Sequence, residues 1–241
     1  DMLNKGSLIV ANGDHSYTAP ADINLVNIAT YRNGLDTSIP YSVGDIWKFQ
    51  LEAEAMKHAH NMLVQLKEDT DNDTITISAA YGKDDFTKDI HTGYTMVLTV
   101  YGGTYLTDDS NSVLNNWLAN NAHKYGFVVR YPSGKEEITG VSDYSYAYRY
   151  VGIAHATYMK QNDLCLEEYI EYLKKNTSDK DVLTIAGADG NAYAVYYARV
   201  DDGGGRIPLP VQTPNPDGST NFEYSISGTN EGGAVITVAL D

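Results

Sequence analysis

Histidine and carboxylate side chains are the groups in this sequence that would hold a metal ion. Asp69, Asp71 and Asp73 alternate in the way that a calcium-binding loop begins. The sixth position of such a loop is Thr74 here instead of glycine, and the twelfth is Ala80 instead of glutamate. We therefore interpret this segment as a solvated acidic turn.

The histidines are scattered along the chain. His58 and His60 stand two residues apart in a segment of helical periodicity, so they point to different faces. His15 and His123 are distant from them in sequence. Because Cys165 is the only cysteine, the chain can form neither an internal disulfide nor a cysteine-based metal site. These residues predict no metal site of their own.

Helices are predicted where apolar residues recur every three to four positions. A long helix is expected from about Asp45 to just before Asp69, and a second from about 110 to 125, with Gly126 as its stop. Further helices are expected at 153–160 and 166–175. The apolar face of the long helix consists of Ile46, Phe49, Met56, Ala59, Met62, Leu63 and Leu66.

Strands are predicted where β-branched and aromatic residues alternate with polar ones or form short apolar runs. The mixture with the helices indicates an α+β fold. Beyond 177 only strands and turns are expected, with loops at 203–205 and 208–218, so we predict a main domain at 1–177 and a β-rich subdomain at 178–241. The predicted strands are 7–10, 74–78, 94–101, 127–130, 146–150, 181–187, 192–200, 221–227 and 234–240.

The composition excludes some partners. A hydrophobic fraction of 42% and 20 tyrosines over 241 residues indicate a folded chain, and a formal charge of -15 disfavours nucleic acid and anionic lipid surfaces. The longest apolar run, at 7–12, is far shorter than a membrane span requires. Because the chain opens at Asp1 rather than methionine, we expect a processed or trimmed start with an export signal upstream.

Four ordered segments resemble VanY-type D-alanyl-D-alanine carboxypeptidases, zinc peptidases grouped with the lysostaphin-type peptidases and the hedgehog domain. They are 120–132, the Thr139-Gly140 pair, the Tyr-Arg-Tyr-Val-Gly segment at 148–152, and 166–169. The resemblance covers about 46–175. It implies a core with a central antiparallel sheet flanked by helices, to which the small C-terminal β subdomain is added.

The resemblance also implies where zinc ligands should stand. The family binds zinc through a His and an Asp of a Ser-x-His-x-x-Gly-x-Ala-x-Asp motif and a His of a Glu-x-x-His motif, whose Glu is the general base. Anchored on Gly93, the first two ligand positions fall on Ile90 and Val97. Anchored on the Tyr-Arg-Tyr-Val-Gly segment, the base falls on Tyr144 and the third ligand on Ala147.

A Tyr-Arg pair of the family, whose Arg grips the substrate carboxylate, is changed too. Tyr81 is kept, but Gly82 follows it, and Lys83 offers only a looser point charge. These changes predict a catalytically inactive homologue that needs no metal cofactor. It would be extracellular or at the surface of a bacterium and would bind a peptidoglycan stem peptide or a surface protein, with no nucleic acid and no membrane span.

Three hypotheses for the former active site remain open. In the first, a surviving groove holds a peptide or glycan without cutting it. In the second, the chain is an active zinc D,D- or L,D-carboxypeptidase with relocated ligands, His91 replacing Ile90. In the third, the groove is filled by the protein's own side chains, since alternate strand tyrosines commonly pack in a core. The groove of the first hypothesis would be lined by Tyr81, His91, Tyr144, Tyr146 and Arg149.

Overall fold

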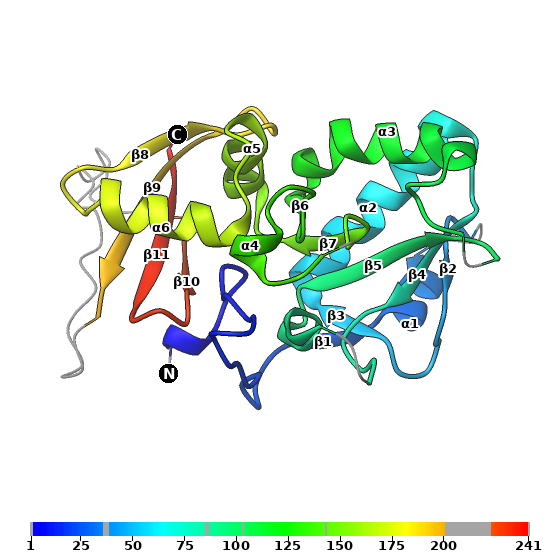
Figure 1. The fold of residues 1–241 in the computed structure, drawn as a ribbon, viewed down its shortest axis with the longest axis horizontal. Coiled ribbons are helices and arrows are strands. Elements are labelled where there is room, and N and C mark those ends of the chain that lie inside the picture. The colour runs from blue at the N-terminus through cyan, green and yellow to red at the C-terminus, as the bar shows by residue number, and fades with distance from the viewer. Residues whose placement is uncertain are drawn as a thin grey trace, which may run out of the picture.

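The fold consists of a five-stranded sheet and a four-stranded sheet placed side by side, with helices packed on both and a small two-stranded sheet at one side (Figure 1). The computed structural model describes residues 2–35, 39–84, 87–102, 104–142, 144–200 and 223–240. The loops predicted at 203–205 and 208–218 lie outside these residues.

The five-stranded sheet has the strand order β2-β4-β5-β7-β6. Strand β2 runs parallel to β4, and the other neighbours are antiparallel, so the sheet is mixed rather than antiparallel throughout. The prediction was wrong at this edge because β2 is only two residues long and lies in a segment expected to be a connection. The strands are β2 (Ser42–Val43), β4 (Ile75–Ala79), β5 (Thr95–Val100), β7 (Ala147–Tyr150) and β6 (Phe127–Val129).

The predicted long helix begins later than its periodicity suggested. Residues 45–49 form a turn, and β3 (Gln50–Glu52) pairs with β1 (Leu25–Asn27) before helix α2 (Ala53–Thr70) starts. The Glu52 carboxylate accepts the free N–H groups of Glu54 and Ala55, which fixes the helix start there. From Met56 onward the predicted apolar face is buried as expected.

Helix α2 covers one face of the five-stranded sheet together with α3 (Ser112–Asn121), as Figure 1 shows. The short helix η4 (Ala122–Tyr125) packs in the same core. Apolar side chains of α2, α3, η4 and strand β4 are buried together in one core. The other short elements are η1 (Met2–Asn4), α1 (Ile28–Leu35), η2 (Lys88–Thr92), η3 (Asp109–Asn111) and α4 (Glu136–Thr139).

The four-stranded sheet is antiparallel, in the order β10-β11-β9-β8. It packs on helices α5 and α6 through an apolar cluster that crosses the predicted boundary at 177/178, because it joins Ile170 and Leu173 to Val195 and Val235. The division into 1–177 and 178–241 stays a prediction. The elements are α5 (Ile153–Gln161), α6 (Leu166–Asn176), β8 (Leu183–Ala186), β9 (Ala192–Arg199), β10 (Tyr224–Gly228) and β11 (Gly233–Leu240).

The N-terminal segment at 7–11 is half-buried at Ser7 and buried from Leu8 onward, but it is not the strand that its sequence predicts. The Val10 amide donates to the Thr229 carbonyl at 3.2 Å, other backbone groups of the segment bond to side chains, and no ladder with a neighbouring strand forms. The Leu8 amide donates to Ser227 Oγ at 2.8 Å, and the carbonyls of Ser7 and Ile9 each accept from Arg149 Nη2 at 3.0 Å. This segment therefore joins the two sheets to each other.

His155 ties α5 to α6 and to the C-terminal sheet. Its Nδ1 lies 2.7 Å from Tyr169 Oη, its Nε2 lies 2.9 Å from Thr237 Oγ1, and burial lowers its pKa to about 4. An unfolded histidine takes up a proton near pH 6.5, whereas the folded one resists until about pH 4, so stability falls as the pH drops through this window.

We expect this histidine to account for about 3 kcal/mol of acid destabilisation between pH 7 and pH 4. In His155→Gln this part of the pH dependence of the unfolding free energy should be absent. Urea titration at each pH measures it. His91→Gln, at an exposed histidine, is the matched control. Equal slopes for wild type and His155→Gln would contradict the assignment.

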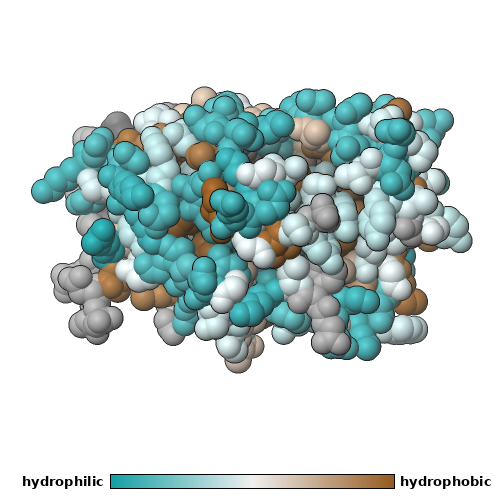
Figure 2. Space-filling view, in the orientation of Figure 1, coloured by the Kyte–Doolittle hydropathy of each residue, from teal (hydrophilic) through white to brown (hydrophobic). Residues whose placement is uncertain are grey.

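The surface seen in Figure 2 is mostly hydrophilic, with hydrophobic residues in small separate groups. Among the described residues, no helix is both long and apolar enough to cross a membrane.

Candidate functional site

The positions aligned with the family's zinc ligands come together in space. Ile90 in η2, Val97 in β5 and Ala147 in β7 belong to one buried apolar cluster, with Ala79 and Tyr131. Val97 and Ala147 are directly opposite each other across the β5–β7 ladder. The sheet thus gathers three positions that are distant in sequence.

These residues do not fit a zinc ion. Zinc requires nitrogen, sulfur or oxygen ligands, and the side chains of Ile90, Val97 and Ala147 are hydrocarbon only. Across the part of the chain that the structure describes, no three His, Cys, Asp or Glu side chains converge in a way that would hold a metal. His91 is exposed while its neighbour Ile90 is fully buried, so His91 does not take the place of Ile90 in the cluster.

The position of the family's carboxylate-gripping arginine has no room for a side chain in this backbone. Gly82 has a φ of +95°, and a Cβ there would stand 2.6 Å from the carbonyl oxygen of Lys48. Tyr81 before it is half-buried, and its carbonyl accepts from the Gln50 amide at 3.0 Å. Glycine is required here by both conformation and close approach.

A row of tyrosine rings leads from the apolar cluster to the surface. The centroids of Tyr131 and Tyr144 are 6.4 Å apart, those of Tyr144 and Tyr146 are 5.4 Å apart, and those of Tyr146 and Tyr105 are 5.2 Å apart. Tyr131 is buried, the middle two are half-buried, and Tyr105 is 50% exposed. Two of the residues predicted to line a groove, Tyr144 and Tyr146, are therefore neighbours in this tyrosine row.

Arg149, also predicted to line the groove, is placed elsewhere. It is fully buried, and its Nη1 lies 2.7 Å from Asp89 Oδ1. Arg130 Nε donates to the same oxygen at 2.8 Å, and its two Nη atoms bind the Glu167 carboxylate at 2.7 and 3.0 Å. Thr95 Oγ1 donates to Asp89 Oδ2. We call these five residues the buried ion network.

The charges within the buried ion network stabilise one another. Burial alone would raise the pKa of the Asp89 carboxyl, but the nearby guanidinium groups of Arg149 and Arg130 outweigh it and hold that pKa below its ordinary value. Burial lowers the pKa of Arg130, but the carboxylates of Asp89 and Glu167 outweigh it and hold that pKa above its ordinary value. The network joins η2, β7 and α6 beside the apolar cluster, since Thr95 pairs with Arg149 two residues along the β5–β7 ladder from the Val97–Ala147 pair.

Sequence reasoning did not find the buried ion network. One signal was present. Arg130 directly follows the apolar strand residues 127–129, and Arg149 stands between two strand tyrosines. A charge buried in such a place must be paired. Nothing in the sequence identified Asp89 or Glu167 as the partners, which lie 41 and 37 residues from Arg130.

Comparisons with known proteins agree with this geometry at the level of the family. The family model VanY, described as D-alanyl-D-alanine carboxypeptidase, matches residues 19–153. A D-alanyl-D-alanine carboxypeptidase of Enterococcus faecium is 34% identical over 136 residues, which are 56% of this chain and 40% of that protein. The putative carboxypeptidase YodJ of Bacillus subtilis is 49% identical over 59 residues, 24% of this chain and 22% of that protein. The chain thus spans well under half the length of these relatives.

The fold has a counterpart among solved structures. The vancomycin resistance D,D-dipeptidase VanXYg, solved in complex with a D-Ala-D-Ala phosphinate analogue, superposes with a TM-score of 0.70. The match covers 99% of this chain and 96% of that one at 20% identity, so it includes the C-terminal sheet. At this identity the likeness establishes a shared fold.

Proposed function

Because the chain belongs to the VanY D-alanyl-D-alanine carboxypeptidase family, we propose that it is a non-hydrolytic member that binds cell-wall stem peptides outside the cytoplasm. The observation that carries the proposal is the apolar cluster at Ile90, Val97 and Ala147, which leaves the aligned zinc positions without a ligand atom. Tyr144 at the aligned base position carries a phenol in place of the family's general-base carboxylate.

The tyrosine row supplies the binding surface in this proposal. Its rings offer flat apolar faces and phenol hydroxyls, which suit the aliphatic and amide groups of a peptide. The rings become more exposed toward Tyr105, so a ligand would lie along the outer part of the row. Tyr144 and Tyr146 pack against the apolar cluster at the former zinc positions, which keeps the ligand where the family's substrates would be expected.

Metal content and hydrolysis test the loss of activity. After incubation with zinc and removal of the excess, purified protein should retain far less than about one zinc per chain, because the ligand atoms are missing. Incubation with muropeptides ending in D-Ala-D-Ala should release no D-alanine. Stoichiometric zinc together with D-alanine release would refute the proposal and favour the relocated-ligand enzyme.

Calorimetric titration of the same muropeptides tests binding. We expect Tyr146→Ala to weaken the affinity by about 2- to 10-fold, the effect of about 0.5–1.5 kcal/mol from one aromatic contact. Tyr224→Ala, at an exposed tyrosine of the C-terminal sheet, is the matched control and should bind as wild type does. If wild type gives no heat of binding at millimolar muropeptide, the row is not a stem-peptide site.

A further inference from the structure

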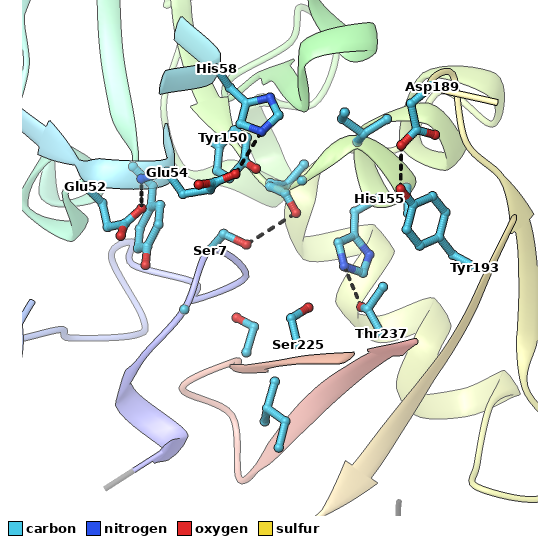
Figure 3. Close-up of a pocket in the computed structure, with 18 residues that line it drawn as sticks. Ser7, Glu52, Glu54, His58, Tyr150, His155, Asp189, Tyr193, Ser225 and Thr237 are labelled. Carbon is cyan, nitrogen blue, oxygen red and sulfur yellow. Dashed lines mark hydrogen bonds and ion pairs between the residues drawn. The ribbon is translucent and has the colours of Figure 1, made fainter. Parts of the chain in front are cut away.

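A cavity of about 500 Å³ opens at the junction of the two sheets (Figure 3). None of the residues aligned with the zinc ligands or the general base lines it. Its walls come from the N-terminal segment, the start of α2, the start of α5, and strands β10 and β11 of the C-terminal sheet. In Figure 3, Glu54 and His58 face it from one side, Asp189 and Tyr193 from another, and Ser225 and Thr237 from below. We call it the junction cavity. Its volume falls in the range of small-molecule sites, which commonly lie between domains.

The junction cavity lies on the opposite face of the five-stranded sheet from the apolar cluster. Side chains alternate along β7, so Ala147 faces the apolar cluster, whereas Tyr148 and Tyr150 face α2. The ring of Tyr150 lines the junction cavity and stacks on His58 of α2, with centroids 5.1 Å apart. A ligand here would therefore be independent of the proposed stem-peptide site.

The polar lining of the junction cavity is one-sided in charge. Carboxylates of Glu52, Glu54 and Asp189 line it, and no lysine or arginine does among the residues placed by the structure. Glu54 Oε1 also lies 3.1 Å from His58 Nε2 and 3.7 Å from Lys57 Nζ, which is outside the lining. Burial raises the pKa of Asp189, but a hydrogen bond from Tyr193 Oη at 2.5 Å and further bonds from Asn191 outweigh it, so the pKa lies below its ordinary value. These carboxylates favour a cation over an anion.

The aromatic lining favours an organic cation over a bare metal ion. Tyr94, Tyr150 and Tyr193 contribute rings to the walls, and ring faces attract ammonium groups within about 6 Å. No three metal-ligating side chains converge anywhere in the described chain, this cavity included. Hydroxyls of Ser7 and Ser225 add hydrogen-bonding groups for the remainder of a ligand.

From the volume, the carboxylates and the tyrosine rings together, we infer that the junction cavity binds a small organic cation carrying a primary ammonium group. The ammonium group lies against the carboxylate of Glu54 or of Asp189, which face the cavity from different sides, and the rest of the molecule contacts the apolar and hydroxyl groups of β10. Because β10, β11 and the N-terminal segment close the cavity, this site gives the C-terminal sheet a role in ligand binding.

Three probes of equal chain length test the charge preference by calorimetry at physiological salt. These are 1,5-diaminopentane, pentane-1,5-diol and glutarate. We expect the diamine to bind at least about tenfold more tightly than the diol, and glutarate not to bind, because the lining carboxylates attract only the first. If the diamine gives no heat of binding at about 10 mM, a concentration that would reveal even a very weak affinity, the inference is overturned.

Variants separate the junction cavity from the acidic surface as a whole. Glu54→Gln with Asp189→Asn should weaken the diamine at least about tenfold. Glu68→Gln with Glu137→Gln removes the same charge from exposed positions on α2 and α4 and should leave the affinity within about twofold.

A steric variant gives a test without any change of charge. Ser225 is exposed at the cavity wall on β10, so Ser225→Trp should fill the space and abolish diamine binding. Unchanged binding in Ser225→Trp, or equal losses in the two charge pairs, would place the diamine elsewhere and overturn the inference. If Ser225→Trp does not fold, the double variant Glu54→Gln with Asp189→Asn, compared with the exposed control pair, still decides the question.

Discussion

We expect Asp89→Asn to lower the free energy of unfolding by about 3–5 kcal/mol, the usual effect of removing one partner of a buried ion pair. Asp89 Oδ1 accepts from Arg130 at 2.8 Å and from Arg149 at 2.7 Å, and all three side chains are fully buried. Asparagine keeps the shape but leaves two guanidinium groups without their shared counter-charge. Urea denaturation at pH 7 measures the loss.

The matched control is Asp73→Asn, which changes the same residue type at an exposed turn and should alter stability by no more than about 0.5 kcal/mol. The effect of Asp89→Asn should also depend on pH. Because the pKa of Asp89 is lowered on folding, its contribution is complete above the ordinary pKa of about 3.9 and is lost as the pH falls through the folded value. A loss below about 1 kcal/mol at pH 7 would mean that the ion network is not a stabilising unit.

Much of the fold was predictable because hydrophobic periodicity is a local property. The helices at 153–160 and 166–175 and the strands from 192 and 234 match the observed elements to within a few residues. The errors lie where non-local contacts decide. The N-terminal segment 7–11 has strand-like residues, but the side chains of Arg149 and Ser227 bind several of its backbone groups, and it forms no ladder.

The candidate site was predictable only in part, for the same reason. The motif register predicted which positions would meet, and the structure does gather Ile90, Val97 and Ala147. The direction of Arg149 was not predictable, because it depends on Asp89 being available as a buried partner from a different segment. The junction cavity was not predictable either, since several separate stretches of the chain form its walls.

Restoring the three ligand types should create a zinc site in this fold. We expect Ile90→His, Val97→Asp and Ala147→His together to bind about one zinc with a Kd below about 1 µM, where wild type binds none stoichiometrically. Val97 and Ala147 are directly opposite across an antiparallel ladder, where Cβ atoms are about 4.5–5.5 Å apart, and two ligand atoms at about 2 Å from one ion can span that gap.

Without zinc the triple variant should be less stable than wild type by several kcal/mol, because it places an aspartate in an apolar cluster. Zinc should recover that loss, since metal binding to the folded state adds to its stability. The matched control replaces the same positions with Gln, Asn and Gln, which are polar and of similar size but poor zinc ligands. Thermal unfolding with and without zinc compares the two. Equal zinc responses would show that Ile90, Val97 and Ala147 do not stand at the family's ligand positions, and the proposed loss of activity would then lack its structural basis.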